Sequence, residues 1–312
     1  MLRAGDDLQI ISGAQQGIDI VSRALLNYGD YVFTENPTYP GAIAAFRARG
    51  AKIVEIDMQP DGIALEALEE NLKKFRPKLL YVMPNIQNPT GYSYNNARKS
   101  RLLGLARYYG AILLEDDYIG ELDYGKTPST PLKAADRSDS VIYLKSFSKI
   151  FMPGLRLAFL TMPKRHKSKL LSIKHSSDIS TSGLTQRAFD LYLRKGYWHT
   201  HILELRERYH RICQETLSAL AAAMPPGVQF AAPSGGLSVW LRLPDGVSAH
   251  KIACAAQERD VLVAEGSTFF PRQAPDAYLR ISFATADAEQ LRRGISTLGA
   301  LIRSAAQPHE KT

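Results

Sequence analysis

Apolar and polar positions follow two alternating patterns along the first two thirds of the chain. Short apolar runs rich in β-branched residues predict strands, and apolar positions that recur about every 3.6 residues predict helices. The predicted strands are Tyr31–Thr34, Lys52–Ile56, Leu79–Met83, Ala111–Glu115, Val141–Lys145 and Leu157–Met162. The predicted helices between them are Ala14–Asn27, Pro40–Arg49, Leu65–Phe75, Ala97–Tyr109 and Lys164–His175. Because strands and helices alternate, we expect an α/β fold with a mostly parallel sheet and helices on both of its faces.

The last third of the chain shows a different pattern. One long helix is predicted over Tyr197–Met224, and the residues from Pro225 to Gly227 end it. Beyond it, the predicted strands are Val228–Ala232, Leu237–Leu243, Val261–Ala264 and Tyr278–Phe283, and the predicted helices are Ala249–Arg259 and Asp287–Ser304. We therefore expect a large domain over residues 1–205 and a smaller C-terminal α+β domain over residues 206–312, joined through the long helix.

Composition narrows the class of protein. The chain has 312 residues, of which 45% are hydrophobic and 22% charged, as in ordinary globular proteins. Its two cysteines, Cys213 and Cys254, lie in no CxxC motif, so a disulfide scaffold is excluded and a cysteine metal site has no support. No apolar run approaches the roughly 18 residues of a membrane helix, and the first residues resemble no signal peptide. We expect a cytoplasmic protein without a membrane partner.

The chain is basic, with a formal net charge of +8 at pH 7. A basic chain can bind nucleic acid, a membrane surface or an anionic ligand. The positive residues are scattered, however, and the densest cluster, Pro163–Lys169, is predicted to form the first turns of a solvated helix. Since no zinc-finger, RNP or basic-zipper pattern accompanies this cluster, we expect no nucleic-acid binding by this chain itself.

The segment with the most chemical content is SFSKIFMPGLR, Ser146–Arg156, which directly follows a predicted strand. Lys149 lies at that strand end beside the small hydroxyl residues Ser146 and Ser148. A partly buried lysine near other cations loses its proton readily and can form a Schiff base. The hydroxyls of Ser146 and Ser148 and the guanidinium of Arg156 could bind a phosphate. A turn with a surface lysine explains the segment equally well, so this stretch alone leaves both interpretations open.

A second segment, SGAQQG at Ser12–Gly17, opens a predicted helix after a short apolar run. Gly13 permits close approach of the backbone to a ligand. The N–H groups of Ala14 and Gln15 at a helix N-terminus could hold an anion. An ordinary helix cap is the alternative.

Two further loops follow predicted strands. NIQNPTG, Asn85–Gly91, places Asn88 before a proline turn, and LLEDDYIGEL, Leu113–Leu122, ends a strand in three carboxylates with Tyr118 beside them. Taken alone, Asn85–Gly91 could be an ordinary β-turn, and Leu113–Leu122 could be an acidic loop that binds a metal. Side chains alternate along a strand, so Glu115, Asp116 and Asp117 cannot all face one ligand. Because ligands bind at the carboxyl ends of parallel strands, the four segments together predict one site.

These segments resemble the motifs of fold-type I pyridoxal-phosphate enzymes, the aspartate aminotransferase superfamily. The resemblance rests on ENPTYPG, NIQNPTG, EDDYIGEL, SFSKIFMPGLR and YLRISFA, the last at Tyr278–Ala284, and it covers essentially the whole chain. It is strongest to the 2-aminoadipate and aromatic aminotransferases and to the aminotransferase-like domain of MocR-type regulators. It implies the fold-type I architecture, pyridoxal 5'-phosphate as cofactor, an amino acid and a 2-oxo acid as substrates, and a homodimer.

The resemblance also implies a role for individual residues. Lys149 would form the internal aldimine and move a proton between Cα and the cofactor. Asp116 would pair with the pyridine nitrogen and favour its protonated form. Tyr118 and Asn88 would hydrogen-bond the phenolic oxygen of the ring, and Tyr39 would stack on the ring face. Arg280 would bind the substrate carboxylate through a bidentate fork, with Asn88 beside it. The phosphate would be held by Ala14, Gln15, Ser146, Ser148 and Arg156.

Two other features receive no catalytic role. His199 and His201 lie two residues apart in a predicted helix and point to different faces, so we expect no metal site there or elsewhere. Thr181–Gln186 resembles a family loop near the dimer interface.

Two functions remain open from the sequence. The first is an aminotransferase. The second is the effector-sensing domain of a MocR-type regulator, in which a winged-helix DNA-binding part precedes the aminotransferase-like domain. The chain begins almost at the phosphate-binding helix, where family members carry further residues, so we expect any DNA binding to require a preceding winged helix.

Overall fold

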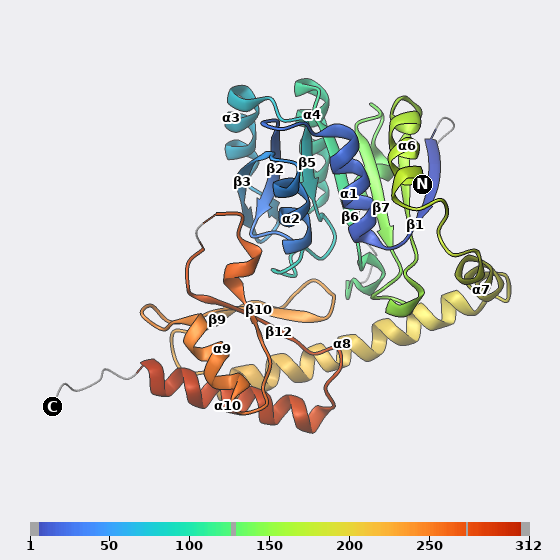
Figure 1. Ribbon diagram of the computed structural model, residues 1–312. Helices are drawn as coiled ribbons and strands as arrows, with labels where there is room; N and C mark the ends of the chain where they lie inside the picture. The colour runs from blue at the N-terminus through green and yellow to red at the C-terminus, as the bar shows by residue number, and fades with distance from the viewer. Residues whose placement is uncertain (1–5, 126–128, 273, 307–312) are drawn as a thin grey trace.

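The structure is a computed structural model that describes residues 6–125, 129–272 and 274–306. Within these ranges, eight strands form a large sheet in the order β1-β8-β7-β6-β5-β2-β3-β4 (Figure 1). Their bounds are β1 Asp6–Ile11, β2 Tyr31–Asn36, β3 Lys52–Gln59, β4 Gly62–Ile63, β5 Leu79–Val82, β6 Ile112–Asp117, β7 Val141–Ser146 and β8 Ala158–Pro163. Strands β3, β2, β5, β6 and β7 run parallel, and the other strands pair antiparallel at the edges. The predicted α/β fold with a mostly parallel sheet is confirmed.

Helices cover both faces of this sheet. Successive side chains of a strand point to opposite faces. In β5, Leu79 and Tyr81 therefore pack in the core beneath α1, α2 and α6, whereas Leu80 and Val82 pack in the core beneath α3 and α4. The bounds of the helices on the large sheet are α1 Ala14–Leu25, α2 Pro40–Ala48, α3 Leu65–Phe75, α4 Asn96–Tyr109, α5 Leu132–Ala135 and α6 Lys167–Ser177.

The C-terminal part forms a second, antiparallel sheet in the order β11-β12-β10-β9. Its elements are β9 Gln229–Phe230, β10 Ser238–Arg242, α9 Ala249–Gln257, β11 Ala264–Glu265, β12 Tyr278–Ser282 and α10 Ala288–Ala306. The long helix α8, Tyr197–Ala223, runs from below the large sheet into the C-terminal part, where it lies beside α10 (Figure 1). Its Trp198 and Leu205 pack beside loops of the large sheet, and its Cys213 and Leu220 belong to the C-terminal core. The predicted division at residues 205 and 206 lies between these contacts and stays a prediction.

The elements that were not predicted include the short β4 and α5 as well as β1 and α7. Strand β1 begins with two aspartates, so its sequence lacks the continuous apolar run that predicts a strand. It pairs with β8 over its whole length. Helix α7, Gly183–Arg194, starts on a poor helix former, and its Leu184 and Leu191 lie exposed, so it has no complete buried face. The predicted helix from Lys164 begins as an α-helix only at Lys167, after a 3₁₀ turn. Within the described ranges, no helix combines the length and apolar content of a membrane span.

Candidate active site

One cavity of about 350 Å³ opens at the carboxyl ends of the parallel strands, between the large sheet and the C-terminal sheet. Every residue that the sequence nominates lines it. Those residues are Ala14, Gln15, Tyr39, Asn88, Asp116, Tyr118, Ser146, Ser148, Lys149, Arg156 and Arg280. The remaining lining is mostly apolar or small and includes Met83, Ile119, Leu237 and Ala284. Segments far apart in the sequence therefore meet at one concave site, as the topology of a parallel sheet predicts.

Asp116 lies at the buried floor of this cavity. The Tyr81 hydroxyl donates a 2.6 Å hydrogen bond to its Oδ2, whereas Oδ1 is buried without a hydrogen-bond partner among the described residues. Burial raises the pKa of Asp116 to about 7, with the Tyr81 hydrogen bond opposing the shift and the charge of Asp117 adding to it. An unpartnered carboxylate oxygen in a cavity is suited to a ligand that brings a hydrogen-bond donor or a positive charge.

The two neighbouring carboxylates face away from the cavity. Glu115 accepts hydrogen bonds from the backbone N–H groups of Leu132 and Lys133 at 2.7 and 2.8 Å, so it caps α5. Burial raises the pKa of Glu115 to about 8. Asp117 lies 3.1 Å from the ammonium of Lys145. Burial opposes its ionisation, but that ammonium holds the pKa of Asp117 below its usual value. Neither lines the cavity, as the predicted alternation requires.

Lys149 lies in the loop that follows β7. The loop is tied back to the sheet, because Phe147 donates its N–H to Leu157 O at 3.1 Å. The neighbouring Ile150 is fully buried, and its carbonyl lies 2.8 Å from His201 Nε2. With Ile150 anchored in the interior, the adjacent Lys149 side chain is free to line the cavity. His201 thus contacts the backbone of this loop. No cluster of His, Cys, Asp and Glu that could hold a metal ion occurs among the described residues.

The loop before α1 forms an anion-binding corner, which we call the cradle and define as the backbone of residues 13–15 with Ser146, Ser148 and Arg156. Gly13 has φ 96°, a left-handed value that favours glycine. A Cβ atom at Gly13 would lie 2.4 Å from Arg156 Nη2, so only glycine lets the guanidinium approach the loop. The first N–H groups of a helix have no acceptor within it. Together with Arg156 they can hold an anionic group.

Arg280 on β12 enters the cavity from the C-terminal part. Its Nη1 donates a 2.7 Å hydrogen bond to Asn88 Oδ1, and its guanidinium carbon lies 4.8 Å from the centroid of the Phe269 ring. Its Nε is buried without a partner among the described residues, and burial lowers the pKa of Arg280. Asn88 thus holds the guanidinium in place, while Nε still lacks a hydrogen-bond acceptor among the described residues. A carboxylate ligand could provide that acceptor.

Sequence reasoning missed two residues behind the site. Tyr81 carries the hydroxyl that fixes Asp116, and the signal was a polar hydroxyl in an otherwise aliphatic strand, since a buried tyrosine needs a partner. Glu35 is fully buried and accepts from Met83 N at 2.9 Å, Tyr94 Oη at 2.8 Å and Gln87 Nε2 at 3.1 Å. It therefore holds the base of the loop that carries Asn88, and its acidic side chain in a buried motif was the available signal.

Comparison with known sequences gives matches over nearly the whole chain. The family model of aminotransferase class I and II matches residues 2–298. The aromatic-amino-acid aminotransferase 1 of Thermococcus litoralis is 34% identical over 302 residues, which cover 95% of this chain and 72% of that protein. The 2-aminoadipate transaminase of Thermus thermophilus is 35% identical over 96% of this chain and 76% of its own length. An uncharacterized HTH-type transcriptional regulator of Escherichia coli, YdcR, is 30% identical, over 96% of this chain but 64% of that protein.

Solved structures of aminotransferases also superpose on nearly the whole chain. Kynurenine aminotransferase of Pyrococcus horikoshii, solved in complex with PMP, superposes with a TM-score of 0.94 at 34% identity, over 98% of this chain and 77% of that chain. LysN, the alpha-aminoadipate aminotransferase of Thermus thermophilus, was solved with N-(5'-phosphopyridoxyl)-L-leucine and superposes with a TM-score of 0.93 at 35% identity. That match covers 96% of this chain and 77% of the other.

Proposed function

The chain belongs to the class I and II aminotransferase family, and we propose that it is a pyridoxal-phosphate-dependent aminotransferase that works in the cavity described above. The family and the fold-type I architecture expected from the motifs are both confirmed. The enzyme moves an amino group from an amino acid to a 2-oxo acid. The observation that carries the assignment of its site is the meeting of Lys149, the unpartnered oxygen of Asp116 and the cradle in one cavity.

Pyridoxal phosphate fits the groups that line this cavity. The buried Oδ1 of Asp116 can accept the N–H of a protonated pyridine ring, and a positive ring beside it would bring the carboxyl back to its ionised form. The cradle, with Arg156, can hold the phosphate. Burial raises the pKa of Tyr118 far above its ordinary value, so its hydroxyl stays protonated and can donate a hydrogen bond to the phenolic oxygen.

The residues of the chain then divide the work. When bound, the cofactor supplies an electron sink for negative charge at the substrate Cα. Lys149 holds the cofactor and carries the proton to and from Cα. The Asp116 carboxylate keeps the proton on the pyridine nitrogen. Arg280 and Asn88 orient the substrate carboxylate, and Tyr39 covers the ring face.

The test is a turnover assay with an amino acid donor and a 2-oxo acid acceptor. The donors to try first are the aromatic amino acids and 2-aminoadipate, which are named for the matched relatives. We expect initial velocities with the parallel-line pattern of a ping-pong reaction, and no turnover by Lys149→Ala. Cofactor binding that depends on Lys149 but gives no turnover with any donor would favour the sensing-domain function instead.

A homodimer is also part of the proposal. Exposed apolar side chains gather on the segment before α7, on α7 and on the first turns of α8, which suits a surface covered by a partner. They are Ile179, Leu184, Leu191, Leu193, Tyr197 and Leu203, with exposed fractions between 42% and 85%. Light scattering should give twice the chain mass, and Leu184→Asp should shift it toward the monomer. A monomeric wild type would contradict this part. The cytoplasmic location expected from the sequence stays a prediction.

A further inference from the structure

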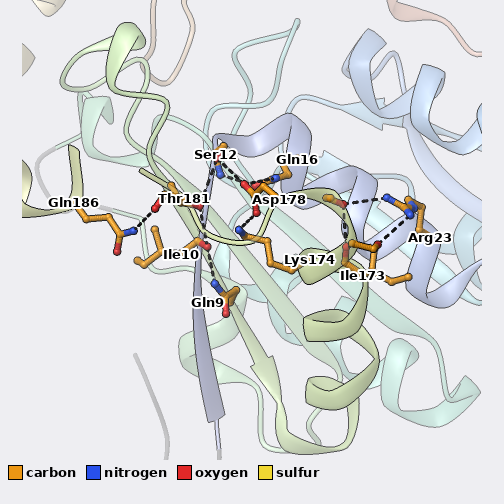
Figure 2. A network of polar contacts seen from close by, with 12 residues as sticks. Gln9, Ile10, Ser12, Gln16, Arg23, Ile173, Lys174, Asp178, Thr181 and Gln186 are labelled. Carbon is orange, nitrogen blue, oxygen red and sulfur yellow. Dashed lines mark hydrogen bonds and ion pairs between the residues drawn. The ribbon is translucent and has the colours of Figure 1, made fainter. Parts of the chain in front are cut away.

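Asp178, in the connection between α6 and α7, is the centre of a polar network behind the cradle (Figure 2). Its Oδ2 accepts hydrogen bonds from Ser12 Oγ at 3.2 Å and from Gln16 Nε2 at 3.0 Å. Its Oδ1 pairs with the ammonium of Lys174, one helical turn earlier on α6. One carboxylate thus joins Ser12 of the loop before α1, Gln16 of α1 and the buried ammonium of Lys174.

The residue that Asp178 holds, Ser12, also contacts Gln16 and the Arg156 guanidinium of the cradle. Ser12 directly precedes Gly13, the position with the left-handed backbone. The Ser12 N–H donates to Gln16 Oε1 at 2.6 Å, and its carbonyl accepts from Arg156 Nη2 at 3.3 Å. Gln16 is itself held by Asp178. Both the loop and the guanidinium of the cradle are therefore connected to this carboxylate through no more than one intervening residue.

A second contact fixes the same connection to the sheet. Thr181 Oγ1 lies 3.4 Å from both Ser12 Oγ and Ile10 O, at the end of β1. The Gln186 side chain of α7 donates to Thr181 O at 2.9 Å. Asp178 and Thr181 of the connection between α6 and α7 therefore lie beside Ser12 and Ile10, as Figure 2 shows.

We propose that Asp178 is a positioning residue that holds the cradle in the shape that binds the cofactor phosphate, acting through Ser12 and Gln16, with Lys174 as its charge partner. The inference rests on the proposed function, since it concerns the phosphate end of the same site. Lys174 also neutralises the charge of the Asp178 carboxylate, which would otherwise repel the cofactor phosphate. Despite partial burial, the hydrogen bonds from Lys174 and Gln16 hold the pKa of Asp178 below its usual value, so it is charged at neutral pH.

The test compares a phosphorylated and an unphosphorylated form of one ligand. Asp178→Ala should raise the dissociation constant of pyridoxal phosphate roughly tenfold, the value of one hydrogen bond to a charged group. It should leave the dissociation constant of pyridoxal, which lacks the phosphate, unchanged. Both are measured by absorbance titration of the full chain, so activity is not needed as a readout.

The matched control is Glu69→Ala. Glu69 forms the same kind of pair one turn apart, with Lys73 at 3.6 Å, but on α3, away from both the cradle and the proposed dimer surface. This control variant should have the same dissociation constants for pyridoxal phosphate and for pyridoxal as the wild type. If Asp178→Ala fails to fold, Asp178→Asn takes its place, because an amide keeps the shape but loses the charge that pairs with Lys174. A smaller loss confined to pyridoxal phosphate is expected of it.

The outcomes separate this inference from the proposed function. An equal loss of affinity for both ligands, or no loss for either, would overturn the role of Asp178 while leaving the Lys149 site intact. A wild-type chain that binds neither ligand in a Lys149-dependent way would instead overturn the proposed function, and this inference with it.

Discussion

The two ends of the cavity are built in different ways. At the ring end, Asp116 is fixed by Tyr81, only 35 residues earlier, on the strand paired directly with its own. At the phosphate end, Ser12 is fixed by Arg156, 144 residues later, and by Asp178, 166 residues later. The first end is set by the alternation and register of neighbouring strands, and the second by contacts between loops that only the complete fold brings together.

This difference explains why the two ends respond differently to substitution. A change at the ring end acts on one buried charge, whereas a change behind the cradle acts through the shape of a loop. We therefore expect large effects on turnover at the first end and effects on cofactor affinity at the second. The following changes test the ring end and its surroundings, from the largest expected effect to the smallest.

Asp116→Asn should lower kcat by roughly 10²–10³-fold, the range seen when one preorganised electrostatic group is removed from an active site. The amide keeps the shape of the side chain but cannot hold the proton on the pyridine nitrogen. The measurement is kcat at saturating cofactor. Glu115→Gln is the control, because that side chain faces the opposite side of the sheet. An Asp116→Asn enzyme with wild-type kcat would contradict the assignment.

Arg280→Lys should raise KM for the amino acid roughly 10–100-fold with a smaller change in kcat, because a lysine cannot form the bidentate fork with a carboxylate. Steady-state kinetics separate the two constants. The affinity for pyridoxal phosphate should not change, since Arg280 lies away from the cradle. A change in kcat alone would show that Arg280 does not bind the ground-state carboxylate.

The pH dependence of stability should differ between Asp116 and Asp117. The pKa of Asp116 is raised from 3.8 to about 7, so its contribution to the stability of the cofactor-free chain is complete below about pH 4 and is lost as the pH rises through about 7. Asp116→Asn should make the fall in Tm over that window less steep. The pKa of Asp117 is lowered, so its contribution is lost as the pH falls. Plots of Tm against pH for Asp116→Asn and Asp117→Asn should therefore deviate from the wild-type plot in opposite directions.

Glu115→Ala should cost about 1–3 kcal/mol of unfolding free energy, because it leaves the Leu132 and Lys133 N–H groups without their acceptor. Cofactor affinity should stay at the wild-type value, since Glu115 does not line the cavity. Chemical denaturation and a cofactor titration measure the two quantities. A loss of affinity with unchanged stability would mean that the two faces of β6 are not independent.

Much of the fold could be predicted from the sequence, because the strands of a parallel sheet and their covering helices have strong apolar patterns. Most of the nominated residues reach the cavity for the same reason: they lie at the end of a strand of the large sheet, in the loop after it, or at the start of a helix. Arg280 is different, because it lies on β12 of the second sheet and enters the cavity from the C-terminal part. Asp178 could not be found this way. It is an ordinary polar residue after a helix, and its partner Ser12 is distant in the chain. Helix α7 was missed because its exposed leucines mark no buried face of this chain.

The most direct test of the site is an absorbance titration of the purified chain with pyridoxal phosphate, with Lys149→Ala beside the wild type, followed by addition of an amino acid donor. We expect a visible band of lysine-bound cofactor in the wild type and no such band in Lys149→Ala. The amino acid donor should convert the wild-type band to the spectrum of pyridoxamine phosphate. A band of equal intensity in Lys149→Ala would contradict the central assignment, because the cofactor would then be held by another amine.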